Sequence, residues 1–307
     1  MSWEPILARP RARTRLTALL ACLSLAATAC GSAKAGTAVP NGDEAAAYVS
    51  AKFADKLKSL AGQFNGNAAR KSVQDTFARF DSRKINSTIT AIQLGDPPAR
   101  LSKNHSNLDS NEYLDSYHPA NSPVEYLLLG PVYASLAPTH WVSTPYTAGD
   151  LNECYWSGAQ DVCKMLQAVS DSIDGGKVDG GKAAKSANSL PGGAVELTAE
   201  VTLSAFLDNR VIVFPDSISS QFDASMKSRP LQTKITLDAD GKLTDLKMSG
   251  RIDGDGHQLE INIHYRLDGV PTDNDLPKVP AASEVTALTD SAAVSDFYAR
   301  MGELQGR

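Results

Sequence analysis

The clearest pattern of hydrophobic and polar positions lies between residues 195 and 267. Val195, Leu197, Ala199, Val201 and Leu203 alternate with polar residues, which predicts a strand with one buried face. Three further strands are predicted over the stretches LQTKITLD, LTDLKMSGRI and LEINIHYRL. Short loops with Asp-Gly separate these stretches, and such loops are typical of antiparallel hairpins. This region therefore predicts an antiparallel sheet with one apolar face.

Apolar residues at helical spacing flank and interrupt this sheet. A helix of about 20 residues is predicted to begin near Asn41 or Asp43, which can cap it. Its apolar face is the series Val49, Phe53, Leu57, Leu60 and Phe64. Other predicted helices are a weak one through Val73, Phe77 and Phe80, one through Val162, Leu166, Val169 and Ile173, a short one in ISSQFDASMKS, and a C-terminal one through Val294, Phe297, Met301 and Leu304.

Residues 85–146 carry a less regular pattern that is still strand-like. STITAIQL is rich in β-branched residues, VEYLLLGPVYASL is apolar and aromatic, and THWVSTPY has the composition of a short strand. The glycine- and lysine-rich segment at 175–193 is either a domain divider or an excursion from one domain. Together these elements predict an α+β fold, in which helices cover the apolar face of the sheet.

The N-terminus has the features of a secretory signal at residues 1–29. Four arginines precede an apolar run that is too short to span a bilayer. The run ends in Ala27-Thr28-Ala29-Cys30, which resembles a bacterial lipobox, so we expect lipidation of Cys30 and an anchor in the cell membrane on its extracytoplasmic face. The alternative is a plain secretory signal followed by an incidental cysteine. Residues 30–42 are small and polar and predict a flexible tether.

Charge and cysteine content narrow the class of protein. Loss of the signal removes four arginines and Glu4, which takes the net charge from −5 to −8 and argues against a nucleic-acid partner. Contact with the membrane would then depend on the anchor. Cys154 and Cys163 are predicted to form a structural disulfide, because the spacing differs from the redox motif C-x-x-C and a metal site would need more ligands nearby.

Motifs for catalysis are missing from the sequence. It contains no G-x-S-x-G elbow, H-E-x-x-H pair, P-loop or dinucleotide-binding glycine pattern, and its five histidines are scattered. We therefore expect no enzyme activity, no cofactor and no metal. Asp238, Asp240, Asp253 and Asp255 are better explained as turn residues than as calcium ligands. The aromatic residues Trp141, Tyr146, Tyr155 and Trp156 could stack on a carbohydrate or could simply pack at strand ends.

The order of these features resembles a known family. The lipobox, the leading helix, the segment TLDADGKLTDLKM and the closing LPKVPAASEV are similar to actinobacterial envelope lipoproteins of the LppX/LprG type, which share the LolA-like fold. The resemblance covers residues 195–287, and more weakly 43–150. It implies a LolA-like lipid-binding domain at 43–290. The sequence departs from the family in its internal disulfide, in the glycine- and lysine-rich loop at 175–193 and in a predicted C-terminal helix at 291–307. In that fold a curved, half-barrel antiparallel sheet holds helices on its concave face.

The resemblance also implies a function. Proteins of this type hold acyl chains of lipids or lipoglycans in an apolar cavity, and an envelope transport protein is a candidate partner. The residues that would line such a cavity here, and that would look the same in a closed core, are Val195, Leu197, Val201, Ile235, Leu237, Leu246, Met248, Ile252, Leu259, Ile261 and Ile263. The leading hypothesis is thus a lipid-binding or lipid-carrying lipoprotein. Alternatives are a protein-binding or structural envelope lipoprotein without a lipid cavity, and an anchored hydrolase.

Overall fold

The computed structural model describes residues 53–60, 62–64, 67–146, 153–175, 177–178 and 181–305. The chain divides into two units, Met1–Ala47 and Tyr48–Arg307, and every described residue belongs to the second unit. The signal, Cys30 and the tether lie outside the described residues and stay predictions. Within the described ranges, no helix is long and apolar enough to cross a membrane.

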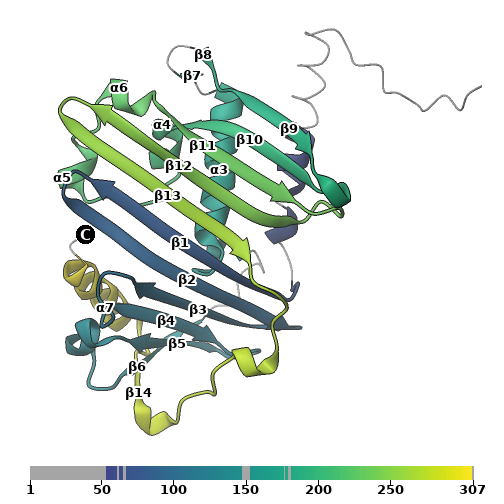
Figure 1. Ribbon diagram of the computed structural model, residues 1–307. Helices are drawn as coiled ribbons and strands as arrows, with labels where there is room; N and C mark the ends of the chain where they lie inside the picture. The colour runs from purple at the N-terminus through teal and green to yellow at the C-terminus, as the bar shows by residue number, and fades with distance from the viewer. Residues whose placement is uncertain are drawn as a thin grey trace, which may run out of the picture. The chain divides into compact units, whose positions relative to one another are not determined.

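The second unit is built on one open sheet of twelve strands (Figure 1). The strand order is β14-β6-β5-β4-β3-β2-β1-β13-β12-β11-β10-β9, and all pairs are antiparallel except β14 with β6. The strands are β1 Arg70–Phe80, β2 Arg83–Gly95, β3 Pro98–Ser106, β4 Tyr113–His118, β5 Val124–Leu129, β6 Trp141–Pro145, β9 Lys185–Ser189, β10 Val195–Thr202, β11 Pro230–Leu237, β12 Leu243–Gly254, β13 His257–Leu267 and β14 Val285–Ala287. The predicted α+β class is therefore confirmed.

The helices are short apart from two. They are a helical stretch at residues 53–60, α3 Gln160–Gly175, α4 Leu203–Asp208, α5 Asp216–Ser219, α6 Ala224–Lys227 and α7 Ser291–Leu304. The 3₁₀ turns are η1 Gly62–Phe64, η2 Pro131–Leu136, η3 Glu153–Tyr155, η4 Pro191–Gly193, η5 Asp273–Asp275 and η6 Ala282–Glu284. The predicted mid-chain, short and C-terminal helices are confirmed, as is the part of the leading helix that the structure describes. Strands β7 Lys177–Val178 and β8 Gly181–Lys182 pair with each other. The two interpretations of the segment at 175–193, a domain divider or an excursion from one domain, both stay predictions.

The predicted hairpins are also confirmed, because β11, β12 and β13 pair in succession. Gly241 and Gly256 occupy the turns with φ of 79° and 80°, a conformation that glycine adopts without steric cost. Asp238 Oδ1 accepts hydrogen bonds from the backbone N–H groups of Asp240 and Lys242, at 3.0 and 2.8 Å. The role predicted for Asp238 as a turn residue is thus confirmed.

The weak helix predicted through Val73, Phe77 and Phe80 is wrong. These residues belong to β1, which pairs along its length with β2 and β13. Residues four apart share a face in a strand as well as in a helix, so the spacing of Val73 and Phe77 did not separate the two structures. The inner-facing positions of β1 include Ser72, Gln74 and Thr76, and these polar residues hid the alternation typical of a strand.

The helices cover one face of the sheet, which we call the inner face. Over β1 and β10–β13, this face packs against the helical stretch 53–60, α3 and α4 in the main hydrophobic core. Over β5 and β6, Leu127, Leu129 and Val142 pack against Phe297 and Met301 of α7 in a second, smaller core. The inner faces of β2, β3 and β4 lie between these two cores and line a cleft.

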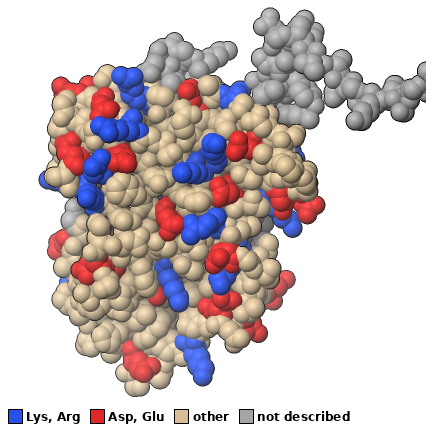
Figure 2. Space-filling view, viewed as in Figure 1, with Lys and Arg blue, Asp and Glu red and all other residues tan. Residues whose placement is uncertain are grey.

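The opposite, outer face of the sheet carries ion pairs. Arg266 contacts Asp75 at 2.6 Å, Arg79 contacts Glu260 at 2.7 Å, and Lys234 contacts Glu196 at 3.8 Å. Figure 2 shows basic and acidic side chains interspersed over the strands that face the viewer in Figure 1. Pairs of this kind at the surface contribute little to stability. A mixed surface of this kind is typical of a face in contact with solvent.

Candidate functional site

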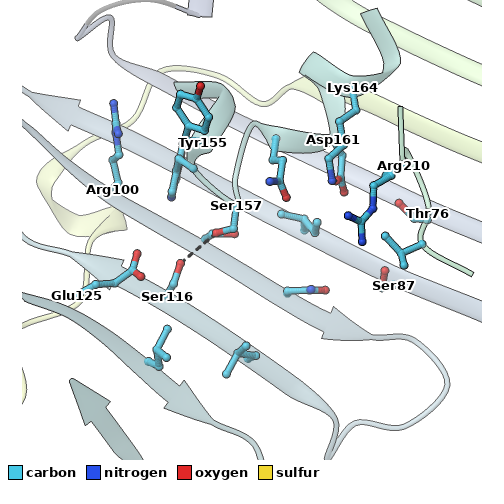
Figure 3. A pocket seen from close by; sticks show the side chains of 18 of the residues that line it. Thr76, Ser87, Arg100, Ser116, Glu125, Tyr155, Ser157, Asp161, Lys164 and Arg210 are labelled. Carbon is cyan, nitrogen blue, oxygen red and sulfur yellow. Dashed lines mark hydrogen bonds and ion pairs between the residues drawn. The ribbon is translucent and has the colours of Figure 1, made fainter. Parts of the chain in front are cut away.

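A cleft of about 940 Å³ lies over the inner faces of β2–β4 (Figure 3). Loop residues that precede α3, the first turns of α3 and the segment after α4 form its opposite side. Its lining residues include Ile85, Ser87 and Ile89 from β2, Arg100, Ser102 and Asn104 from β3, Leu114, Ser116 and His118 from β4, Glu125 and Leu127 from β5, Tyr155, Trp156 and Ser157, Asp161 and Lys164 from α3, residues 210–213, and Tyr298 from α7. The lining is therefore mixed, with aliphatic side chains beside hydroxyl, amide and charged groups.

A disulfide holds the loop that forms one wall of the cleft. Cys154 and Cys163 are bonded, as predicted, and the loop between them carries Trp156 and Ser157. Ser157 Oγ lies 3.2 Å from Ser116 Oγ of β4, within hydrogen-bond distance, and this contact joins the loop to the sheet (Figure 3). By loop-closure entropy, so short a ring stabilises the folded chain by at most about 3 kcal/mol.

The same loop approaches the sheet closely at Gly158. A Cβ atom at this position would lie 2.6 Å from the Trp156 ring and 2.7 Å from the Ala91 Cβ on β2. Both distances are shorter than van der Waals contact, so only glycine fits without displacement of a neighbour. Gly158 thereby allows Trp156 to lie against the inner face of the sheet.

The other wall contains α3 and the segment that follows α4. Gln74 of β1 donates from Nε2 to Asp161 Oδ2 at 3.0 Å, and Lys164 Nζ lies 3.8 Å from Asp161 Oδ1. Arg210 has a positive φ of 54° and an exposed side chain at the cleft. Figure 3 shows Arg210 at the end of the cleft near Thr76 and Ser87, opposite the end that holds Arg100. The cleft therefore has a cation at each end, one buried and one exposed.

Three residues that line the cleft each have a buried donor atom without a hydrogen-bond partner in the described part of the chain. These atoms are Nη2 of Arg100, Oγ of Ser102 and Nε1 of Trp156. The three residues are only 5%, 2% and 7% exposed. Buried polar groups are nearly always hydrogen-bonded, since an unmade bond costs about 1–3 kcal/mol. Their occurrence in one cleft makes this place the candidate site.

His118 and Glu125 lie at the Arg100 end of the cleft on neighbouring strands. His118 Nε2 donates to the Ser122 carbonyl oxygen at 2.9 Å, and its ring stacks on Tyr146 with centroids 3.7 Å apart. Burial lowers the pKa of His118, so the neutral imidazole is favoured. Burial raises the pKa of Glu125, for which the described residues supply no hydrogen bond or ion pair. This end of the cleft is therefore partly desolvated.

A second hollow of about 340 Å³ continues the cleft toward the β1–β2 turn. The two hollows share Ile85, Ser87, Asn104, Leu114 and Val213. Beyond these shared residues the second hollow is lined by Phe80, Leu108, Tyr133, Phe214 and Ile218, together with polar groups. The end away from Arg100 therefore has large apolar side chains beside the charged groups of Arg83, Lys84 and Glu112.

The eleven cavity residues predicted from the sequence lie elsewhere. Ten of them are buried in the main core beneath α3 and α4, and Val195 is half-buried against that core. None of the eleven lines the hollows described above. Their proposed contact with a ligand stays a prediction, while β2–β4 and the disulfide loop supply the lining that sequence reasoning missed. The irregular pattern over residues 85–118, with polar residues at inner-facing positions, is the signal in the sequence that could have indicated this lining.

The aromatic residues singled out in the sequence are partly brought together. Tyr146, Tyr155 and Trp156 line the cleft, and Trp141 of β6 is not among its lining residues. Tyr155 is mostly exposed, whereas Trp156 is buried. Among the described residues no group of three or more His, Cys, Asp or Glu side chains could hold a metal ion.

The comparisons with known proteins find structural likeness without sequence relatives. No family model and no curated protein matches the sequence. The chain is similar to the lipoprotein LppX of Mycobacterium tuberculosis, with 10% identity, a TM-score of 0.27, and coverage of 71% of this chain and 91% of that chain. It is also similar to a LolA superfamily protein from Nitrosomonas europaea, with 10% identity, a TM-score of 0.24, and coverage of 75% and 98%.

Proposed function

We propose that this protein is a non-enzymatic lipoprotein that binds an amphiphilic lipid or lipoglycan in the cleft over β2–β4. The observation that carries the proposal is the cleft itself. Its volume of about 940 Å³ is at the upper end of the range for small-molecule sites, and a second hollow with large apolar side chains extends it. A ligand with an acyl chain and a polar group matches this mixture of side chains.

The sequence supports a location for this activity. A cleavable signal followed by lipidation of Cys30 would anchor the chain at the extracytoplasmic face of the cell membrane, and residues 30–42 would tether the folded unit to the anchor. A protein held there meets membrane lipids directly, and an envelope transport protein is its candidate partner. Of the two solved structures named above, one is of a lipoprotein and the other of a LolA superfamily protein.

The alternative is a protein-binding lipoprotein without a lipid site. It would be favoured by a broad exposed apolar surface in place of a cleft. The exposed large apolar residues with the highest exposure in the described ranges are Val270, Tyr155, Leu108 and Val279, which belong to separate segments of the chain. The cleft therefore makes lipid binding the better supported function.

Co-purifying lipid tests the proposal directly. The full chain carrying Cys30→Ser cannot be acylated at that position, so any acyl lipid found with it is bound non-covalently. We expect native mass spectrometry and solvent extraction to find lipid in amounts near one per chain. A chain that is purified empty, and that takes up no lipid from membranes, would contradict the proposal.

A pair of variants on one strand locates the lipid. Ser87 lines both hollows, and Ser87→Trp would fill their junction. Thr90 lies on the outer face of the same strand β2 and is also half-buried, so Thr90→Trp adds the same bulk outside the cleft. We expect the first variant to lose bound lipid and the second to retain it, with similar melting temperatures. Equal loss or equal retention in the two variants would place the lipid elsewhere.

A further inference from the structure

The Arg100 side chain has no counter-ion among the described residues. It is only 5% exposed, its Nε donates to Gln93 Oε1 at 2.8 Å, and no carboxylate contacts it in the described part of the chain. Gln93 is itself oriented, since its Nε2 donates to the Ala68 carbonyl oxygen at 3.0 Å. A buried charge is stable only when it is paired or hydrogen-bonded, because water is excluded from it. The guanidinium is thus held in a fixed direction with part of its donor capacity unused.

Two further donors lie beside this guanidinium. Ser102 follows Arg100 by two residues on the same face of β3, so its hydroxyl points into the same cleft. The Trp156 ring centroid lies 5.8 Å from the Arg100 Cζ, within cation–π distance. Ser102 Oγ and Trp156 Nε1 are both buried without a described partner. Three donors of this kind, one of them charged, suit an acceptor that carries negative charge.

The two ends of the site lie far apart along the strands. Arg100 pairs with Gln93 of β2, and Ile85, which lines both hollows, lies eight residues from Gln93 along that strand. At a rise of about 3.4 Å per residue, roughly 27 Å separates the donor end from the end with the large apolar side chains. The far end also carries the exposed cations Arg83, Lys84 and Arg210, whereas the Arg100 end combines a buried cation with two further buried donors.

We propose that the Arg100 end of the cleft binds the oxyanion of an acidic amphiphile, a phosphate or a carboxylate, with Arg100, Ser102 and Trp156 as donors. The inference rests on the proposed function and names the class of lipid that the cleft takes. Guanidinium groups bind such oxyanions through parallel N–H donors, which also fixes their orientation. Gln93 is a positioning residue in this site, because it acts through Arg100.

A competition between two lipids tests the proposal. The full chain carrying Cys30→Ser, in detergent, is incubated with an equimolar mixture of dioleoyl phosphatidic acid and dioleoylglycerol, and native mass spectrometry gives the ratio bound. We expect the acidic lipid to be preferred by about tenfold or more, which corresponds to one charge-assisted hydrogen bond. Arg100→Met should bring the ratio close to one without loss of total bound lipid.

The matched control removes the same charge from the other face of the same strand. Lys103 is exposed on the outer face of β3, and Lys103→Met should leave the ratio unchanged. A structural arginine would also destabilise the fold when replaced, whereas we expect Arg100→Met to keep or raise the melting temperature, since it removes a buried charge without a counter-ion. Arg100→Lys keeps the charge without the planar fork, and we expect it to restore part of the selectivity.

The outcomes separate this inference from the proposed function. If both lipids bind equally to the parent chain and to Arg100→Met, the oxyanion site is wrong and lipid binding stands. Equilibrium dialysis with labelled inorganic phosphate adds a second arm. Suppose that the chain binds phosphate through Arg100 but binds neither lipid. The oxyanion site would then be supported, and the proposal that its oxyanion belongs to a lipid would be wrong. A chain that binds neither the lipids nor phosphate would overturn both proposals.

Discussion

The two parts of the inner face differ in what covers them. Beneath β10–β13, aliphatic side chains such as Leu197, Ile235 and Ile263 pack against helices and are almost completely buried. Over β2–β4, the equivalent positions include Ser102, Asn104 and Ser116 beside Ile85 and Ile89, and they face a cleft. One continuous sheet therefore supplies both a closed core and an open site. The inner-facing residues are aliphatic over the core and mixed over the cleft.

Truncation of one aliphatic residue in each part measures this difference. Ile263→Ala in the main core should lower the free energy of unfolding by about 2–5 kcal/mol, because it leaves a cavity among packed neighbours. Ile89→Ala at the cleft should cost about 1 kcal/mol or less, since the half-buried side chain is only partly packed. Urea denaturation of both variants gives the comparison. Equal losses would mean that the cleft is as tightly packed as the core.

The disulfide joins the wall of the cleft to α3. Replacement of Cys154 and Cys163 together by serine should lower the free energy of unfolding by at most about 3 kcal/mol, because the unfolded chain gains entropy. It should also weaken lipid binding, since Trp156 and Ser157 lie in the released loop. Unfolding and lipid retention are measured on the same samples. Unchanged lipid retention would show that the loop is not part of the site.

Gly158 tests the close contact between the loop and the sheet. Gly158→Ala would push the Trp156 ring and Ala91 apart, and overpacking of this kind costs about 1–3 kcal/mol. The displaced indole should also weaken lipid binding at the Arg100 end. This loss of binding should be larger than a small fall in melting temperature would explain. Gly175→Ala is the control, because no atom lies within 4 Å of a Cβ placed there. Similar effects of the two changes would argue against a specific contact.

Burial of Glu125 should make the stability of the folded chain depend weakly on pH. Because burial raises its pKa in the folded state, its stabilising contribution is present below the unfolded pKa of about 4.3 and is lost as the pH rises through the folded pKa. Glu125→Gln removes this loss. We expect the variant to melt at a higher temperature than the parent near neutral pH, and the difference to shrink below about pH 4. A difference independent of pH would assign the effect to packing.

Some strands could be predicted from the sequence more accurately than others. The alternation in β10–β13 and the Asp-Gly turns were sufficient to predict the hairpins, since each strand buries one uniform apolar face. Strand β1 was mistaken for a helix, because Ser72, Gln74 and Thr76 at its inner positions broke that alternation. The same mixture of polar and apolar residues on β2–β4 made those strands hard to delimit, although it marks the site.

The amino-acid sequence by itself determined the sheet's hairpins, the disulfide pair, the main helices and the expectation of a lipid anchor at Cys30. Each of these depends on neighbouring residues or on a short spacing along the chain. The tertiary structure decided which inner-facing residues are core and which line the cleft, because that depends on where helices far away in the chain are placed. It also brought together Arg100, Ser102 and Trp156, of which only Trp156 had been singled out in the sequence, since a site assembled from separate elements leaves no spacing rule.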